Sequence, residues 1–302
     1  MIILILTWDL GGMDKQPITI PVVGDLDDRD KQHIRLTYVT HFYFNQDSAS
    51  AIIGLLRKYE QYRPQLLSIM QFVVVDDGSP LEFDIPEFRL NLIWLRIDRD
   101  IPWNQGGARN LGAIFAKSDK MILTDLDHEF PEETLEYAAR MGDLRNKMYK
   151  IHTKDPESGQ THRGHPNIFL MSRGRFLRLW GYDEEFSGGH GGEDFRFVKY
   201  QKYHGTWFRH LPKKYVCMPR NDIDRGAEYH SLVRDQSRNS KIDPLKKAQI
   251  IYWGKEAGHS RIFLNFPWHR VVEYSLPRPS DVRHRKWWKK FWLIRTILGG
   301  DP

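Results

Sequence analysis

The sequence predicts an α/β fold in which a mostly parallel central sheet is flanked by helices. Between residues 34 and 150, strand-like runs alternate with helix-like runs, and this alternation is typical of parallel strands joined by helical crossovers. Two of the strand-like runs, QFVVVDD and KMILTDLD, are continuous apolar stretches that end in acids. Such stretches are expected of strands that are covered on both faces of a sheet.

The predicted elements follow one another in a regular order. The run IRLTYVTHFYF is rich in β-branched and aromatic residues and predicts a strand. A helix is expected over residues 51–62, and Pro64 lies beyond its end. Further strands are predicted at residues 71–77, 90–98, 120–127 and 168–172, and further helices at residues 106–118, 131–141, after the glycines at 188–192, and at residues 243–258.

These elements suggest one large domain with two extensions. Residues 1–33 form an N-terminal extension of edge strands or a hairpin, and residues 34–240 form the main domain. Residues 241–302 are predicted to be a C-terminal helical region with a basic amphipathic tail. The total of 302 residues is sufficient for a substantial core.

The composition is that of a soluble globular protein, with 40% hydrophobic and 28% charged residues. The single cysteine, Cys217, excludes a disulfide within the chain and favours a reducing, cytoplasmic setting. The opening run MIILIL is too short to span a bilayer and lacks the pattern of a signal peptide. The net charge of +6 favours anionic partners such as nucleotide diphosphates, anionic lipid head groups or nucleic acid.

Acidic residues follow two of the predicted strands, at the edge where α/β sheets bind ligands. Asp76 and Asp77 can accept hydrogen bonds from a base or a ribose, although they are equally typical of a capped turn. Asp125 and Asp127 flank one residue of an extended chain and therefore point the same way. They can share Mg²⁺ or Mn²⁺ with a diphosphate. The alternative for Asp127 is to cap the helix that follows.

A third candidate site is the segment GGHGGED at residues 188–194. Glycines allow the backbone to approach a ligand closely. Glu193 and Asp194 follow these glycines where a helix begins, and a carboxylate there can take a proton from an attacking hydroxyl. The alternative is that both acids only cap the helix.

Taken together, these motifs resemble known glycosyltransferases. The segments FVVVDDGS, NQGGARNLG and LTDLD are similar to the nucleotide-sugar half of family 2 glycosyltransferases. The segment LWGYDEEFSGGHGGEDFRF resembles the C-terminal motif of β-1,4-galactosyltransferases and chondroitin-polymerase-type enzymes. The resemblance covers residues 34–235. It implies a GT-A (Rossmann-like) fold, with a nucleotide-sugar half at 34–130 and an acceptor half at 131–240.

The resemblance also implies roles for individual residues in donor binding. Thr40, together with Asp76 or Asp77, would hold the uridine and ribose of a UDP-sugar. Arg109 would contact the nucleotide, although as an isolated residue it is equally typical of a helix surface. Asp125 would contribute to the donor site as the first acid of a DXD motif.

A second set of implied roles concerns metal binding and catalysis. Asp125 and Asp127 would bind Mn²⁺ or Mg²⁺, and His230 in the segment YHSLVRD would be the third ligand. Asp194 would be the catalytic base, and Glu193 would bind acceptor hydroxyls.

This chain also departs from the relatives at two positions. Ala227 replaces a methionine that accompanies the metal-binding histidine, and His190 replaces a tryptophan that contacts the sugars. The choice of donor and acceptor therefore does not carry over. Trp180 and Tyr182 are alternative stacking residues or parts of the core.

The implied activity is metal-dependent transfer of a hexose or N-acetylhexosamine (Gal, GalNAc or Glc) with inversion, as in polysaccharide biosynthesis. The donor would be a UDP-sugar, and the acceptor a hydroxyl of a glycan or lipid-linked glycan. One alternative is a nucleotidyltransferase, whose glycine-rich basic N-terminal signature the sequence lacks. The other is a non-catalytic nucleic-acid or glycan-binding protein. Acids at successive strand ends would repel phosphates, so no nucleic acid is expected.

The C-terminal tail, residues 281–302, is basic and amphipathic. Read as a helix, it places Trp287, Phe291, Ile294 and Leu298 on one stripe, with arginines and lysines nearby. Such a helix suits a peripheral contact with an anionic membrane, at its inner face for a cytoplasmic protein. The alternative is a terminal helix packed on the core.

Overall fold

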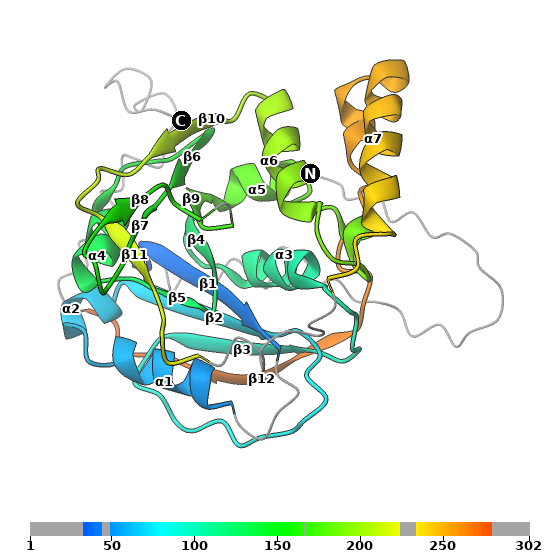
Figure 1. Cartoon of the computed structure of the whole chain (residues 1–302). Coiled ribbons are helices and arrows are strands. Elements are labelled where there is room, and N and C mark those ends of the chain that lie inside the picture. Colours follow the sequence, from blue (N-terminus) through cyan, green and yellow to red (C-terminus); the bar gives the residue numbers. More distant parts are fainter. Residues whose placement is uncertain (1–32, 44–48, 166, 224–233, 280–302) are drawn as a thin grey trace, which may run out of the picture.

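The computed structural model (Figure 1) describes residues 33–43, 49–165, 167–223 and 234–279. Within these residues an eight-stranded sheet forms the centre, in the order β10-β6-β9-β4-β1-β2-β3-β12. Its strands are β1 (Leu36–Phe42), β2 (Met70–Asp76), β3 (Leu92–Ile97), β4 (Lys120–Asp125), β6 (Lys147–Lys150), β9 (Phe169–Ser172), β10 (Trp207–His210) and β12 (Trp268–Tyr274). A smaller sheet, in the order β5-β11-β7-β8, comprises β5 (His128–Glu129), β7 (His152–Lys154), β8 (Thr161–His162) and β11 (Val216–Pro219).

The middle of the large sheet is parallel, as the sequence predicted. Strands β3, β2, β1 and β4 are neighbours and all run in the same direction. The chain builds β1, β2 and β3 outward on one side and then returns to place β4 on the other side of β1. The strand order therefore reverses between β1 and β4, and open α/β sheets bind ligands at such a switch point.

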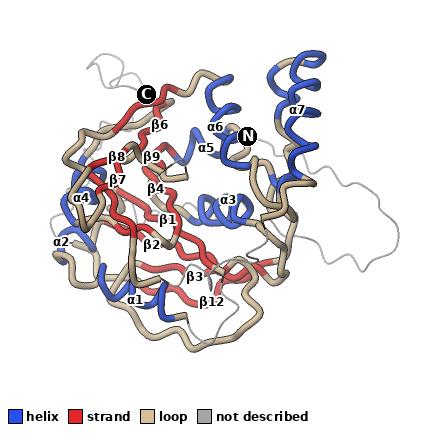
Figure 2. The backbone as a smooth tube through the Cα atoms, viewed as in Figure 1, coloured by secondary structure: helices blue, strands red, loops and turns tan. Residues whose placement is uncertain are grey.

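Helices cover both faces of this sheet, and Figure 2 shows α3, α5 and α6 together on one of them. One core cluster packs β-strand side chains against α1 (Ser50–Tyr59), α2 (Pro64–Leu67) and α4 (Glu132–Arg140). The other packs them against α3 (Gln105–Phe115), α5 (Arg173–Arg178) and α6 (Glu193–Tyr203). The chain also forms α7 (Asn239–Trp253) and the short helices η2 (Glu184–Phe186) and η3 (Lys255–Gly258).

The local sequence explains the core elements. Every residue of β2 is buried, because its apolar side chains meet a helical layer on each face of the sheet. Helix α3 lies close to the sheet because Gly112 faces Val39 of β1 and Val75 of β2, leaving no room for a side chain. The start of α3 is held at the carboxyl end of β2, where Asn104 Nδ2 donates to Asp77 Oδ1 at 3.0 Å.

The flanks of the sheet differ from the prediction. Strand β12 pairs antiparallel with β3, so the region 241–302, which was predicted to be helical, contributes a strand to the central sheet. On the other flank, β9 runs antiparallel to both β4 and β6. These pairings depend on contacts between distant segments, which local periodicity does not encode. The predicted N-terminal extension (except His33) and the tail at 281–302 lie outside the described residues.

Among the described residues, no helix is both long enough and apolar enough to span a bilayer.

We predict that Gly112→Ala destabilises the protein by about 1–3 kcal/mol, because the added methyl group would clash with Val39 Cγ1. Gly54→Ala is the matched control, since nothing lies within 4 Å of a Cβ at that position of α1. Alanine should stabilise α1 by up to about 1 kcal/mol. Urea unfolding of both variants measures the difference. Equal effects of the two substitutions would contradict the close packing of α3.

Candidate active site

The candidate site lies at the carboxyl ends of β1, β2 and β4. In the pairing of β1 with β4, His41 is opposite Asp125, so the first acid of the DXD motif lies directly at the switch point. Asp125 follows Met121 and Leu123 on the α3 face of the sheet. Its side chain is directed toward α3, where it forms an ion pair with Arg109.

Arg109 is the centre of the site. Its side chain is completely buried, and its guanidinium pairs with the carboxylates of Asp125 and Asp194, at 2.8 Å from Asp194 Oδ1. It also donates to the hydroxyl of Tyr182 at 3.2 Å. Arg109 therefore joins β4 to the start of α6. The sequence predicted a contact with the nucleotide, and that contact stays a prediction because the guanidinium already bridges two carboxylates.

The charge on Asp125 is stabilised by this environment. Burial alone would raise the pKa of Asp125, but the Arg109 guanidinium and the neighbouring histidines His41 and His165 outweigh burial and lower it. Asp125 is consequently an anion at neutral pH.

The second acid of the DXD motif has a different partner. Asp127 Oδ1 lies 2.6 Å from His128 Nδ1, while Asp125 Oδ2 lies 3.7 Å from His165 Nδ1. His165 interacts electrostatically with both aspartates, and its ring is 5.2 Å from that of His128. His165 was not predicted as a site residue, because it is one of three histidines in the polar segment before β9 and belongs to no motif.

A divalent cation fits these two aspartates only with further ligands. In the part of the chain that the structure describes, no three His, Cys, Asp or Glu side chains form a metal site. Among the same residues, Asp125 and Asp127 each keep one carboxylate oxygen without a hydrogen bond, which is the donor type that Mg²⁺ and Mn²⁺ prefer. The third predicted ligand, His230, lies outside the described residues.

The GGHGGED segment forms a loop that ends in α6, as predicted. Gly188, Gly191 and Gly192 have φ angles of 94°, 80° and 94°, in the left-handed region that favours glycine. Asn239, the first residue of α7, fixes this loop: its Nδ2 donates to the carbonyls of Gly189 and Gly191, both at 2.7 Å. Asn239 lies about 50 residues after this loop in the sequence and belongs to no motif, so it was not predicted as part of the site.

Glu193 and Asp194 occupy the first turn of α6, and burial raises the pKa of both. The pKa of Glu193 rises to about 7, because its carboxyl is buried and lies next to Asp194. Its Oε2 atom is buried and has no hydrogen-bond partner in the described residues. The pKa of Asp194 also rises through burial and through Asp125, although Arg109 opposes the shift. Glu193 is therefore suited to exchange a proton near neutral pH, and Asp194 is a stronger base than an ordinary aspartate.

The residues predicted to bind uridine are divided between two faces of the sheet. Thr40 is buried on the α1 and α4 face, and Asp76 follows β2 residues on the same face. Asp76 Oδ1 accepts from the backbone N–H of Ser79 at 2.8 Å, as expected of a capped turn. Asp77 lies on the α3 face, where it accepts from Asn104 at 3.0 Å. Their contacts with a nucleotide stay predictions.

The aromatic candidates have separate environments. Tyr182 belongs to the core, because its ring is buried and stacks on Phe197 with centroids 4.2 Å apart. Trp180 is exposed at 41% of its surface. His190, at the position where the relatives carry tryptophan, packs edge-on against Trp103 with ring centroids 4.5 Å apart. Trp103 and His190 thus form an aromatic pair beside the glycine-rich loop.

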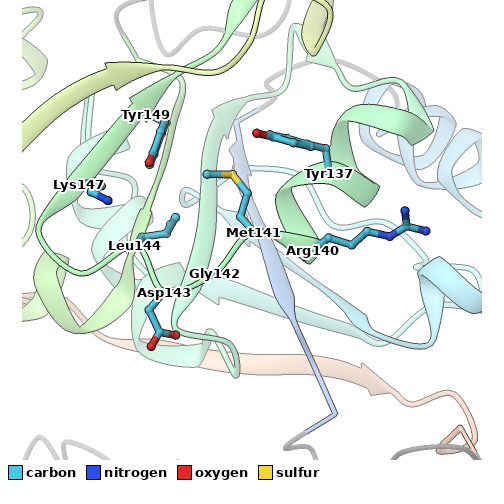
Figure 3. A pocket seen from close by; sticks show the side chains of 8 residues that line it. All are labelled: Tyr137, Arg140, Met141, Gly142, Asp143, Leu144, Lys147 and Tyr149. Carbon is cyan, nitrogen blue, oxygen red and sulfur yellow. The ribbon is translucent and has the colours of Figure 1, made fainter. Parts of the chain in front are cut away.

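A surface pocket of about 400 Å³ lies elsewhere, between the end of α4 and the start of β6. In Figure 3, Tyr137 and Tyr149 lie on either side of Met141 at this pocket. Near this pocket, the Lys120 side chain donates to the carbonyl of Ala139 in α4 at 2.6 Å. Because Lys120 is the first residue of β4 and Asp125 is the last, the pocket lies at the opposite end of β4 from Asp125. The pocket is therefore separate from the candidate active site.

Comparison with known proteins supports the fold assignment. No family model and no curated protein matches the sequence. TarS 1–349 from S. aureus, solved in complex with UDP-GlcNAc, matches with a TM-score of 0.50 and 15% identity, over 71% of this chain and 66% of the TarS chain. The mannosyltransferase PcManGT from Pyrobaculum calidifontis, solved with GDP-Man and Mn²⁺, matches with a TM-score of 0.42 and 19% identity, over 64% and 58% of the two chains.

The chain thus spans slightly less than two thirds of TarS 1–349. At this identity the likeness concerns the fold alone. The protein has the α/β fold of GT-A glycosyltransferases, with a large central sheet flanked by helices, and this confirms the predicted fold class.

We predict that Arg109→Met destabilises the protein by about 3–5 kcal/mol at pH 8, because it leaves two partly buried carboxylates without their cation. The loss should be smaller at pH 5, where carboxylates whose pKa has risen accept protons. In the control Arg63→Met, an exposed arginine loses its pairs with Glu132 and Glu136, and stability should change little because water screens these pairs. Chemical denaturation at both pH values tests this; equal losses for the two variants would contradict it.

A second prediction concerns Glu193. Its pKa in the folded protein, about 7, lies above the ordinary value of 4.5, so the folded state loses stability as pH rises from 4.5 through 7. Glu193→Gln removes this ionisation and should stabilise the protein by up to about 3 kcal/mol at pH 8, relative to its effect at pH 4.5. Thermal unfolding of both proteins across this range is the measurement. A difference that does not depend on pH would show that Glu193 titrates normally.

Proposed function

We propose that the protein is an inverting, metal-dependent glycosyltransferase that uses a UDP-sugar. The observation that carries the proposal is the convergence of Asp125, Arg109 and Asp194 at the switch point of a GT-A fold. This arrangement brings the first acid of the DXD motif and the candidate base, which are distant in sequence, to the same guanidinium. The similarity of the fold to TarS, which binds UDP-GlcNAc, supports a nucleotide-sugar donor.

Asp125 and Asp127 would hold the metal ion, with His230 or His165 as a further ligand. When bound, Mn²⁺ or Mg²⁺ would supply positive charge that offsets the charge of a diphosphate leaving group. Thr40, Asp76 and Asp77 would contact the uridine and ribose. The first donors to test are UDP-galactose, UDP-GalNAc and UDP-glucose, and the similarity to TarS adds UDP-GlcNAc.

Asp194 would act as the base in a single displacement. Its carboxylate takes the proton of an acceptor hydroxyl while the oxygen forms a bond to the anomeric carbon. The bond between that carbon and the phosphate oxygen breaks at the same time, and its electron pair leaves with UDP. Attack opposite the leaving group inverts the anomeric centre.

Several features of the described residues suit this chemistry. The pKa of Asp194 is raised by burial, which makes it a stronger base than an ordinary aspartate, and Arg109 keeps its carboxylate in place. Glu193 has a buried oxygen without a partner, and this oxygen would receive a hydrogen bond from the acceptor. The acceptor would be a glycan or a lipid-linked glycan.

The test is release of UDP from a panel of UDP-sugars, with Mn²⁺ or with EDTA. We expect turnover of one donor with Mn²⁺ only. Asp194→Asn should lower kcat by roughly 10²–10⁴-fold and leave UDP affinity unchanged, because the base does not contact the nucleotide. Asp127→Ala should weaken the binding of metal and UDP together.

Two further variants sharpen this test. His165→Ala and His230→Ala, each titrated with Mn²⁺, identify which histidine completes the metal site. Asp143→Asn is the control, because this exposed acid lies at the pocket on the far end of β4. Metal-independent binding of RNA, with neither UDP binding nor turnover, would exclude a glycosyltransferase and favour a binding protein.

A further inference from the structure

The end of helix α7 carries an unusual group of exposed apolar side chains. Ile251, Tyr252 and Trp253 are exposed at 80%, 81% and 73% of their surfaces, and Leu245, two turns earlier on α7, is exposed at 61%. In Figure 1, α7 projects from the body of the protein, and Ile251, Tyr252 and Trp253 are the last three residues of this helix. Large apolar side chains gathered on a surface usually mark an interaction site. We call Ile251, Tyr252 and Trp253 the α7 tip.

The geometry of the α7 tip indicates what kind of surface can cover it. Successive residues of an α-helix are rotated by about 100°, so the three side chains point in directions that span roughly 200° around the axis. The remaining direction is covered by η3, because Ile250 packs against Gly258, where an added Cβ would lie 2.8 Å from Ile250 Cδ1. A flat protein surface beside the helix cannot contact all three side chains. A fluid interface into which the helix end dips can surround them.

The residue types and charges agree with a lipid interface. Tyrosine and tryptophan combine an apolar ring with a polar group, and they are favoured where hydrocarbon meets water. Lys255 follows the tip two residues after Trp253, is exposed and has no ion-pair partner among the described residues, so it is available to anionic head groups. Nearby acids are paired: Asp243 with Lys247 at 2.8 Å, and Glu256 with Arg261 at 3.4 Å.

We propose that the α7 tip docks the protein on an anionic lipid bilayer by inserting its apolar side chains into the head-group region. This site differs from the basic tail at 281–302 and does not depend on the proposed enzymatic activity. The first turn of α7 holds the glycine-rich loop through Asn239, and α7 extends about 20 Å from there to Trp253. Docking through the tip therefore holds the loop within roughly 20 Å of the membrane surface, in reach of the lipid-linked acceptor of the proposed function.

The test is co-sedimentation of the full-length protein with vesicles of phosphatidylcholine, with and without phosphatidylglycerol. We expect binding to the anionic vesicles. The variant Ile251→Ser/Tyr252→Ser/Trp253→Ser should lower the partition coefficient by roughly tenfold or more, because it removes the inserted apolar surface. Thermal unfolding should be unchanged, since these side chains contribute little to the core. Trp207→Ser is the matched control: Trp207 is 58% exposed on β10, and its loss should alter binding by less than about twofold.

If something other than a lipid bilayer covers the α7 tip, vesicle co-sedimentation and gel filtration give different results. Unchanged vesicle binding by the triple variant would overturn the proposal. Deletion of residues 281–302 separates the two candidate anchors: if it abolishes binding while the triple variant keeps it, the tail is the anchor and the proposal fails. If the wild type does not bind vesicles and elutes as a dimer that the triple variant converts to a monomer, the tip is a contact between two copies of the chain.

Discussion

The structure depends on the neutralisation of one buried guanidinium. Arg109 is fully enclosed, and an enclosed cation must be paired and hydrogen-bonded to remain in the folded protein. Its partners come from β4 and from α6, which precede and follow the antiparallel strands β6 and β9. Satisfying Arg109 therefore sets the distance between the parallel part of the sheet and the segment that starts α6. The next residue, Asn110, strengthens this junction by bonding the backbone of Tyr182 at both its N–H and its carbonyl.

The charges around Arg109 do not balance, and this imbalance has a chemical consequence. One guanidinium faces the carboxyl groups of Asp125, Asp194 and Glu193. Asp125 keeps its charge, whereas the pKa values of Glu193 and Asp194 are raised. The excess negative charge is therefore relieved by protons on the α6 side. On the β4 side, the negative charge of Asp125 lies near His165 and Asp127. An added cation would be stabilised there. Within this network, the carboxyl groups with raised pKa values are thus separated from the position that would suit a cation.

The sequence allowed the central part of this arrangement to be predicted, because it depends on local patterns. The apolar runs of β1, β2 and β4 and the glycine-rich start of α3 follow directly from composition and periodicity. The bridging role of Arg109 was not predicted, because the face of α3 that is buried depends on how the sheet is oriented beneath it. His165 and Asn239 lie in no recognisable motif. The pairing of β12 with β3 joins segments that are far apart in sequence, so local propensity gave no signal for it.

The C-terminal region was expected to be an appendage, but its buried polar contacts make it a part of the site. Lys246 of α7 is buried and pairs with Asp183 at 3.1 Å, and Arg196 of α6 pairs with Asp243 of α7. Together with Asn239, these bonds hold both ends of the segment that contains the glycine-rich loop. The loop glycines adopt left-handed backbone angles and provide little rigidity of their own. The position of Asp194 relative to Arg109 and Asp125 thus depends on α7, and a displacement of this helix would be transmitted directly to the glycine-rich loop.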